Sequence, residues 1–313
     1  MRLVIALGGN ALLRRGEPMS AEVQRRNIRT AAAVLAPVVE KHSVIVTHGN
    51  GPQVGLLALQ AAALKTVPAY PLDVLGAESE GMIGYLLEQE LGNVLRPGSL
   101  VATLLTQIEV DPGDPAFEAP TKPIGPVYSQ EEAEIIGRHH SWTMARDGGK
   151  FRRVVPSPAP RSLIELRTIE ILLASRVTVI CAGGGGIPVV KTAGGGLSGV
   201  EAVIDKDWAS ELVARLLGAD GLVMLTDVAA VELDHGSARA RRIRTANPSS
   251  LSSLAFDAGS MGPKVGAGCA FAARTGGFAA IGALPELQDI LAGEAGTHIS
   301  SRHAGITLAR AAG

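Results

Sequence analysis

Short apolar runs alternate with segments of helical periodicity along the whole chain. Leu3–Ala6 and Val44–Thr47 are almost entirely apolar and have the length of buried strands. The segment that starts near Ser20 spaces its apolar residues for one helix face, at Val23, Ile28, Ala31, Leu35 and Val38. Strands with so few polar positions are typical of a parallel sheet with helices on both faces.

The alternation continues to the far end of the chain. Asp73 is positioned to cap a helix, and Ser129 with Glu132 and Ser162 with Glu165 have the spacing of a capping box. Further helices are expected at 53–64, 166–173, 208–217, 264–274 and 286–291, and further strands at 100–105, 151–155, 177–182, 222–226 and 278–281. This order predicts an α/β fold in which a mainly parallel sheet lies between helix layers and binds ligands at the carboxyl ends of its strands.

Three segments break the pattern. Between Asp111 and Pro126, prolines stand at positions 112, 115, 120, 123 and 126, which excludes a regular helix and predicts an ordered excursion or lid. Gly194–Gly199 matches the spacing of a dinucleotide-binding turn, but no helix is expected directly after it, so we interpret it as a flexible connection. Ser300–Gly313 has no clear pattern and is expected to be a frayed tail.

Composition and charge narrow the class of protein. With 46% hydrophobic and 19% charged residues, the chain has the make-up of a globular enzyme, and its net charge of −1 argues against a broad surface for nucleic acid. Cys181 and Cys269 lie far apart and no Cys/His cluster occurs, so a zinc site or disulfide framework is not expected and a reducing cytoplasm fits best. The sequence has neither a signal-peptide pattern nor an apolar run long enough to span a membrane.

Two glycine–asparagine turns follow the first two predicted strands. They are Leu7–Ala11 (LGGNA) and Thr47–Gly51 (THGNG). Glycine lets a ligand approach the backbone closely, and the unpaired N–H groups at the start of a helix attract phosphate or carboxylate. Two such turns at neighbouring strands predict a cradle for two anionic groups held side by side. We interpret His48 as a hydrogen-bonding strut, with catalysis by its imidazole as the less favoured alternative.

Three lysines stand in stiff or glycine-rich settings. Lys122 lies between two prolines in 120–123 (PTKP), Lys206 lies between two aspartates, and Lys264 follows a Gly-Pro pair. Phosphoryl transfer needs cations on the transferring group and on the oxygens on either side of it, with little covalent help from the protein. Each lysine alone is more often a surface residue, but together with the two turns the lysines favour a phosphoryl-transfer site.

The two aspartates beside Lys206 admit two interpretations. Asp205 and Asp207 could simply pair with charges in their own loop. Alternatively, Asp207 could orient the lysines while Asp205 helps to hold a magnesium nucleotide. The phosphate loop GxxxxGK[ST] is absent from the sequence, so nucleotide phosphates would need another cradle.

The chain resembles carbamate kinases of the amino acid kinase superfamily over about residues 1–299. The resemblance is carried by segments 6–11 (ALGGNA), 48–55 (HGNGPQVG), 120–126 (PTKPIGP), 154–158 (VVPSP), 183–190 (GGGGIPVV) and 199–207 (GVEAVIDKD). The first and last segments are general to the superfamily, whereas HGNGPQVG and TKPIGP are much more specific to carbamate kinases.

The resemblance implies a fold and an activity. The fold would be a three-layer αβα sandwich with a mainly parallel central sheet and a small protruding subdomain at about 111–156 that closes over the site. Residues 1–207 would bind carbamoyl phosphate, and residues 208–313 would bind the nucleotide. The reaction would be reversible phosphoryl transfer between carbamoyl phosphate and ADP, giving ATP and carbamate with Mg²⁺, in a homodimer.

The same resemblance implies roles for individual residues. The phosphoryl group would be held by Gly8, Gly9, Asn10, Gly49, Asn50 and Gly51. Lys122 and Lys206 would stabilise the transferring charge, and Asp207 would organise them. Lys264 would reach the nucleotide phosphates. The adenine pocket would lie near Thr226, Asp227 and Met261.

Other functions stay open. Another kinase of the superfamily, acting on acetylglutamate, a nucleoside monophosphate or another small acid, would need a larger pocket, and TKPIGP argues against it. A nucleotide-responsive sensor without catalysis is the second alternative, although Lys122, Lys206 and Asp207 are all present. A dehydrogenase would rest on Gly194–Gly199 alone and comes last.

Overall fold

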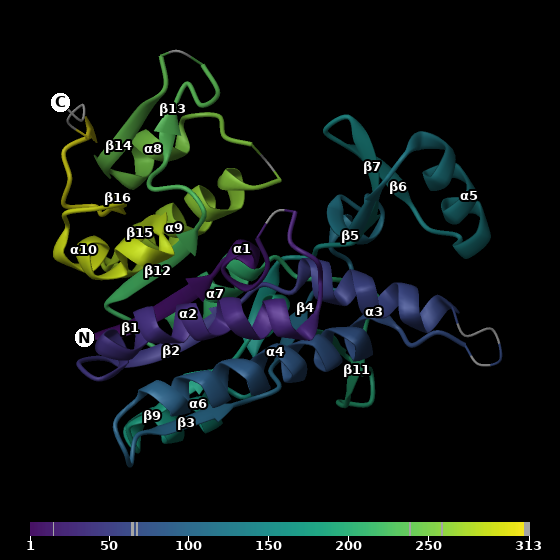
Figure 1. Cartoon of the computed structure of the whole chain (residues 1–313), viewed down its shortest axis with the longest axis horizontal. Helices are drawn as coiled ribbons and strands as arrows, with labels where there is room; N and C mark the ends of the chain where they lie inside the picture. Colours follow the sequence, from purple (N-terminus) through teal and green to yellow (C-terminus); the bar gives the residue numbers. More distant parts are fainter. Residues whose placement is uncertain (15, 64–65, 67, 238, 258, 310–313) are drawn as a thin grey trace.

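The computed structural model describes residues 1–309 apart from 15, 64, 65, 67, 238 and 258, and of Asn10 it describes the backbone alone. Figure 1 shows a body of sheet and helices from which one small subdomain projects. Among the helices of the described residues, none combines the length and the apolar character needed to cross a bilayer.

The body is built on one large sheet. Within the described residues its strand order is β13-β14-β16-β15-β12-β1-β2-β9-β3, with β17 beside β14. The strands are β1 Arg2–Leu7, β2 Ser43–His48, β3 Leu100–Thr103, β9 Val177–Ile180, β12 Gly221–Thr226, β13 Glu232–Leu233, β14 Arg241–Ala246, β15 Phe278–Ala283, β16 Thr297–Ile299 and β17 Ile306–Leu308. Every neighbouring pair from β15 to β3 is parallel, whereas antiparallel pairs gather at the other edge. The predicted mainly parallel sheet is confirmed.

Alternate residues of the central strands pack on opposite helix layers. In β1, positions 3, 5 and 7 belong to one buried cluster, and positions 4 and 6 belong to another. The first layer contains α2 Ala21–Val39, α4 Leu72–Val94 and α10 Leu287–Ala292. The second contains α6 Leu166–Ala174, α7 Lys206–Leu216, α8 Pro248–Ser252 and α9 Met261–Thr275. This arrangement confirms the three-layer αβα sandwich.

A three-stranded sheet and one helix form the projecting subdomain (Figure 1). Its elements are β5 Lys122–Tyr128, α5 Gln130–His140, β6 Met144–Asp147 and β7 Lys150–Val155, in the strand order β5-β7-β6. Two of the prolines lie in β5, an edge strand, where a missing N–H donor is tolerated. The base of β5 packs on α3 (Gly51–Ala63), where a Cβ on Gly55 would lie 2.0 Å from Cα of Gly125. Within the excursion predicted at 111–126, residues 115–117 form the 3₁₀ turn η1 and residues 122–126 belong to β5, so the last part of the excursion lies in this subdomain.

A second, four-stranded sheet follows the order β11-β10-β4-β8. Its strands are β4 Gln107–Val110, β8 Pro160–Leu163, β10 Ile187–Lys191 and β11 Leu197–Gly199. β10 and β11 form an antiparallel hairpin, closed where the amide of Thr192 donates to the carbonyl of Gly196 at 2.8 Å. The interpretation of Gly194–Gly199 as a flexible connection is therefore wrong, because this glycine-rich stretch makes the turn and one strand of an ordered hairpin.

One of the three predicted capping signals is confirmed, and the structure adds an N-cap at Ser20 that was not predicted. The Ser20 hydroxyl accepts the amide of Val23 at 3.3 Å at the start of α2. Ser129 and Glu132 form both hydrogen bonds of a capping box at the start of α5. The helix predicted at 53–64 begins two residues earlier, and position 64 lies outside the described residues.

The other two capping predictions are wrong. α4 begins at Leu72, one residue before Asp73, and the Leu72 amide donates to the Glu201 carboxylate at 2.8 Å instead. Ser162 lies within β8 and donates to Glu109 at 2.6 Å, so it caps no helix. In both cases a side chain distant in sequence replaces the local partner that the spacing suggests.

Two boundary predictions also need correction. The strand expected at 100–105 ends at Thr103. The tail expected to fray after Ser300 instead contributes β17, which pairs antiparallel with β14, and the side chain of Asn247 donates to the carbonyl of His303 at 3.0 Å. Residues 310–313 lie outside the described part of the chain.

Candidate active site

The two glycine turns lie side by side at the carboxyl edge of the sheet. β1 and β2 are parallel neighbours with Leu7 opposite His48, and the amide of Gly49 donates to the Leu7 carbonyl at 3.0 Å. The short helix α1 (Gly9–Leu12) begins in the first turn, and α3 begins in the second. The predicted order of strand, turn and helix is confirmed at both places. The unpaired N–H groups that open the two helices therefore share one edge.

Close packing requires glycine at two of these positions. A Cβ on Gly8 would lie 2.7 Å from the carbonyl oxygen of Leu225, which accepts the Gly8 amide. A Cβ on Gly49 would lie 3.1 Å from Cδ of Lys206 and 3.4 Å from the amide nitrogen of Gly9. The stem of Lys206 thus runs directly against the second turn, with the first turn adjacent.

Asp207 joins two of the three predicted lysines. Its carboxylate accepts from Nζ of Lys206 at 2.9 Å and from Nζ of Lys264 at 3.0 Å. Lys206 opens α7 and Lys264 lies in the first turn of α9, so one carboxylate links the starts of two helices. Asp207 is only 2% exposed, and both ion pairs are therefore largely shielded from solvent.

Asp205 joins the third lysine to the same cluster. One carboxylate oxygen accepts the amide of Asp207 at 2.9 Å and caps α7, while the other pairs with the ammonium of Lys122 from β5. The projecting subdomain therefore reaches the body through an ion pair at the site. Both aspartates pair with nearby charges, and Asp207 lies between two lysines.

The charged groups of this cluster shift one another's pKa values. Burial opposes the charge on Asp205, but Lys122 and Lys206 outweigh burial and lower its pKa to about 2. Burial also opposes the charge on Lys206, yet the two aspartates raise its pKa above the ordinary value. Burial and the ammonium of Lys206 together lower the pKa of Lys264, against the pull of Asp207. Three ammonium groups share two carboxylates, so the cluster suits a further anion.

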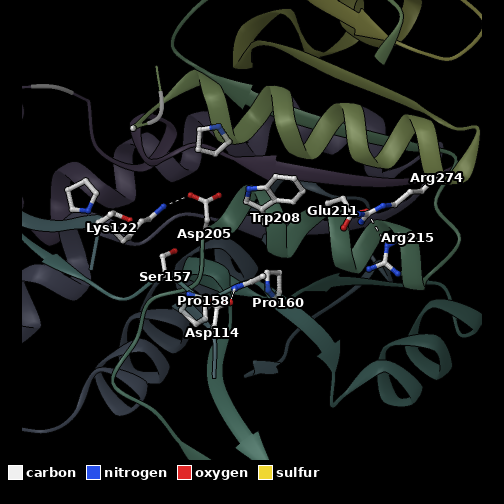
Figure 2. A pocket seen from close by; sticks show the side chains of 15 residues that line it. Asp114, Lys122, Ser157, Pro158, Pro160, Asp205, Trp208, Glu211, Arg215 and Arg274 are labelled. Carbon is white, nitrogen blue, oxygen red and sulfur yellow. Dashed lines mark hydrogen bonds and ion pairs between the residues drawn. The ribbon is translucent and has the colours of Figure 1, made fainter. Parts of the chain in front are cut away.

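A cavity of about 740 Å³ opens beside the cluster. Figure 2 shows Lys122 and Asp205 at one end and Glu211, Arg215 and Arg274 at the other. Glu211 accepts from the two guanidinium groups at 3.1 Å and 3.3 Å, so these arginines already have a protein partner. The end near Lys122 adjoins three ammonium groups that share two carboxylates, and it is therefore the better place for a ligand anion.

The residues predicted to hold the nucleotide lie in two groups. Thr226 is the last residue of β12, and its hydroxyl donates to the Asp227 carboxylate at 3.1 Å. The residue before it in the strand accepts the Gly8 amide through its carbonyl oxygen. Met261 opens α9 and packs partly buried against the core, three residues before Lys264. Lys264 of this set joins the lysine–aspartate cluster through Asp207.

The side chain of Asn50 is fixed by contacts within the fold. The side-chain amide of Asn50 donates to the hydroxyl of Ser79 at 2.7 Å and packs against Gly184, where a Cβ would lie 2.0 Å from Nδ2. Asn50 thus ties its turn to α4 and to the 3₁₀ turn η2 (Gly183–Gly185). The side chain of Asn10 lies outside the described residues.

Sequence reasoning missed one buried acidic residue near the turns. Glu80 lies on α4 with 1% of its surface exposed, and its carboxyl group accepts the amides of Thr106 and Gly183. The signal was available, since position 80 shares the apolar helix face of Ile83 and Leu87. A glutamate on such a face needs polar partners from elsewhere in the fold.

The acidic residues of the site can be tested for a metal ion. In the described part of the chain, no three side chains of His, Cys, Asp or Glu gather as a metal site. Mg²⁺ in kinases is commonly held by one or two carboxylates together with substrate phosphates. Asp205 and Asp207 fit a site in which carboxylates and substrate phosphates hold the Mg²⁺ together, because each lies at the cluster and is already oriented by a lysine.

Comparison with known proteins agrees with this geometry. The amino acid kinase family model matches residues 1–279. The chain is 54% identical over 307 residues to the carbamate kinase of Haemophilus influenzae, which covers 98% of this chain and 99% of the relative. Carbamate kinase from Giardia lamblia bound to citric acid matches with a TM-score of 0.90 at 40% identity, covering 96% of this chain and 98% of that one. The same Giardia enzyme bound to AMP-PNP matches with a TM-score of 0.86 at 39% identity and the same coverage. The chain therefore belongs to the amino acid kinase family, within its group of carbamate kinases, and is a kinase.

Proposed function

We propose that the chain catalyses reversible phosphoryl transfer between carbamoyl phosphate and ADP, giving ATP and carbamate. The observation that carries this proposal is the position of Lys206. Its stem packs against the Gly49 turn, and its ammonium pairs with the carboxylate that also holds Lys264. A largely shielded cation thus lies between an anion cradle and a second lysine. The carbamate kinase relatives, one of them bound to AMP-PNP, support the choice of substrates.

The chemistry needs charge and position more than proton transfer. In the direction of ATP formation, a terminal phosphate oxygen of ADP attacks the phosphorus of carbamoyl phosphate. The bond from phosphorus to the carbamoyl oxygen breaks, and carbamate leaves with the electron pair. The attacking and leaving oxygens are both ionised, so the step requires no general base. Preorganised cations beside these oxygens supply the stabilisation.

Each part of the site has a role in this scheme. The cradle residues Gly8, Gly9, Asn10, Gly49, Asn50 and Gly51 hold the phosphoryl group. Lys122 and Lys206 stabilise the charge that spreads during transfer, and Asp207 keeps the lysines in place. Lys264 contacts the nucleotide phosphates, and the adenine binds near Thr226, Asp227 and Met261. Mg²⁺, when bound with the nucleotide, neutralises phosphate charge beside Asp205 and Asp207.

The proposed binding halves follow the chain. Residues 1–207 hold carbamoyl phosphate through the turns after β1 and β2, and residues 208–313 hold the nucleotide through β12 and α9. The subdomain at about 111–156 closes over the site as a lid, because Lys122 already reaches Asp205 from it. We further propose a cytoplasmic homodimer that binds neither nucleic acid nor membrane, in line with the net charge of −1.

The experiment that tests the function is ATP formation from carbamoyl phosphate and MgADP, with Lys122→Ala as the site variant. Lys150→Ala, an exposed lysine of the same subdomain, is the matched control. We expect turnover by the natural sequence and by the control, and a loss of about 10²-fold or more in Lys122→Ala. A folded protein that binds ADP but forms no ATP from carbamoyl phosphate would contradict the proposal and favour another small-acid kinase or a sensor.

A further inference from the structure

The cavity of about 740 Å³ continues past Lys122 and Asp205 into a part that the proposed chemistry does not use. We call this part the α7–α9 groove, and its lining includes Trp208, Arg215, Pro263, Arg274 and residues 158–160. Because α7 rises about 1.5 Å per residue, Arg215 lies about 15 Å along the helix from Asp205. The far end of the groove is therefore too distant to contact a phosphoryl group held at the lysine–aspartate cluster.

Two helices form one wall of the α7–α9 groove. Trp208 and Arg215 share a face of α7, and Pro263 and Arg274 lie about three turns apart on one face of α9. A Cβ on Gly266 would lie 3.0 Å from Cζ2 of Trp208. The missing side chain at Gly266 thus lets the indole pack on α9 while it still lines the cavity.

The opposite wall is apolar and fixed in place. Figure 2 shows Pro158 and Pro160 across the cavity from Trp208. Asp114 holds this segment, because its carboxylate accepts the amide of Ala159 at 2.9 Å and the amide of Ala116 at 2.9 Å. The charge of Asp114 is therefore committed to the backbone. The space between the proline rings and the indole suits a flat apolar ring.

The far end of the α7–α9 groove carries a net positive charge. One oxygen of Glu211 accepts both from Nε of Arg215 at 3.1 Å and from Nη1 of Arg274 at 3.3 Å. These bonds use one donor of each guanidinium group, which has five. Glu211 is buried, whereas the side chains of Arg215 and Arg274 are 32% and 57% exposed. The further donors of the two arginines can therefore bind an anionic group that enters from the cavity.

We infer that the α7–α9 groove binds a small aromatic anion, such as an aromatic carboxylate or sulfonate. Its ring lies between Trp208 and the proline wall, and its acidic group lies on Arg215 and Arg274. Inorganic phosphate would gain only the contacts of the arginines, and an uncharged ring would gain only the apolar walls. The groove therefore selects ligands that combine both features. This site is separate from the cradle and does not rest on the proposed function.

The test is the binding of anilinonaphthalenesulfonate, an aromatic monoanion, followed by energy transfer from Trp208. Trp142→Phe removes the other tryptophan of the chain and keeps a ring beside Arg153. In this background we expect saturable binding, with the uncharged N-phenylnaphthylamine bound about tenfold more weakly. Arg274→Gln leaves Arg215 to pair with Glu211, and it should weaken the anion about tenfold and the uncharged probe by less than about twofold. Arg167→Gln, which changes an exposed arginine of α6, is the matched control and should leave both affinities unchanged.

A variant of the opposite wall tests the ring site without touching the ion pairs. Ala159→Phe keeps the amide that Asp114 accepts and fills the space between the walls, so it should weaken both probes about tenfold or more. Affinity for the anion that is unchanged in Arg274→Gln or in Ala159→Phe would overturn the inference. Displacement of the probe by carbamoyl phosphate or MgADP, with no response to Arg274→Gln, would place the probe in the substrate site and overturn it as well. A protein that forms no ATP but binds the anion in an Arg274-dependent way would fail the proposed function and keep the groove as a binding site.

Discussion

The two parts of the candidate site attract an anion by opposite means. The cradle after β1 and β2 is built from backbone N–H groups and from closely packed glycines, of which Gly8 leaves no room for a Cβ and Gly49 leaves little. The cluster at the starts of α7 and α9 is built from full charges, with three lysines around two aspartates. The cradle offers fixed partial charges that cost little to bury, whereas the cluster stores charge that must be balanced within the protein.

This difference predicts different consequences of mutation. A change in the cradle should alter how well carbamoyl phosphate binds and leave the folded state nearly as stable as before. A change in the cluster should alter both stability and the rate of transfer, because the same ion pairs hold the fold and the reacting charge. Substitutions in each part can test whether binding and stability separate in this way.

The largest loss of stability is expected when the carboxylate shared by two lysines of the cluster is removed. Asp207→Asn leaves the largely shielded ammonium groups of Lys206 and Lys264 without their common counter-ion, so we expect a loss of about 3 kcal/mol in the free energy of unfolding. Glu211→Gln on the same helix is the control. Its partners Arg215 and Arg274 are more exposed and can turn to water, so it should cost less. Urea unfolding of both variants makes the comparison, and equal losses would contradict a special role for the cluster.

The contribution of Asp205 to stability should depend on pH. Lys122 and Lys206 lower the pKa of Asp205 in the folded state to about 2 from an ordinary value of 3.8, although burial opposes the shift. The unfolded state therefore binds more protons between these values. The stabilising pairing is present above pH 3.8 and is lost as the pH falls through about 2.

We expect the free energy of unfolding of the natural sequence to exceed that of Asp205→Asn by about 2 kcal/mol at pH 5. This difference should shrink steadily below pH 3.8. Chemical unfolding at several pH values measures it. A difference that does not change with pH would show that the charge of Asp205 contributes nothing to the folded state.

The cradle is challenged by adding one methyl group. Gly49→Ala places a Cβ against Cδ of Lys206 and the amide of Gly9, so the turn must shift by a few tenths of an ångström. We expect the KM for carbamoyl phosphate to rise about tenfold, with unfolding free energy changed by less than about 1 kcal/mol. Gly92→Ala, in a helix with open space around the added Cβ, is the control and should match the natural sequence in KM. A large loss of stability in Gly49→Ala with an unchanged KM would reverse the proposed division.

The sequence predicted these two parts unequally. The cradle could be predicted from the sequence, because both turns directly follow apolar strands. Parallel pairing of β1 with β2 is then enough to bring the two turns together. The lysines were identified by their settings, but their partners were not, since Lys122 and Asp205 are 83 residues apart and meet only through the packing of β5 on the body. Glu80 could have been noticed on the apolar face of its helix, although its partners Thr106 and Gly183 are distant in sequence.

Local signals failed where distant side chains intervened. Asp73 was expected to cap α4, but Glu201 accepts the first amide of that helix. The tail after Ser300 carries little periodicity, yet strand β14 provides the hydrogen bonds that order β17. Sequence periodicity therefore predicted the layers and the sheet, and long-range hydrogen bonds determined the ends of elements and the charge pairing.

The measurement that tests the central claim most directly is the kcat of ATP formation from carbamoyl phosphate and MgADP in Lys206→Met, beside the natural sequence. Lys206 is the one residue that touches the cradle and belongs to the cluster in the described contacts. The account predicts a kcat lower by about 10²-fold or more, with the KM for carbamoyl phosphate changed far less. A variant that folds and keeps its kcat within a few-fold of the natural value would contradict the account.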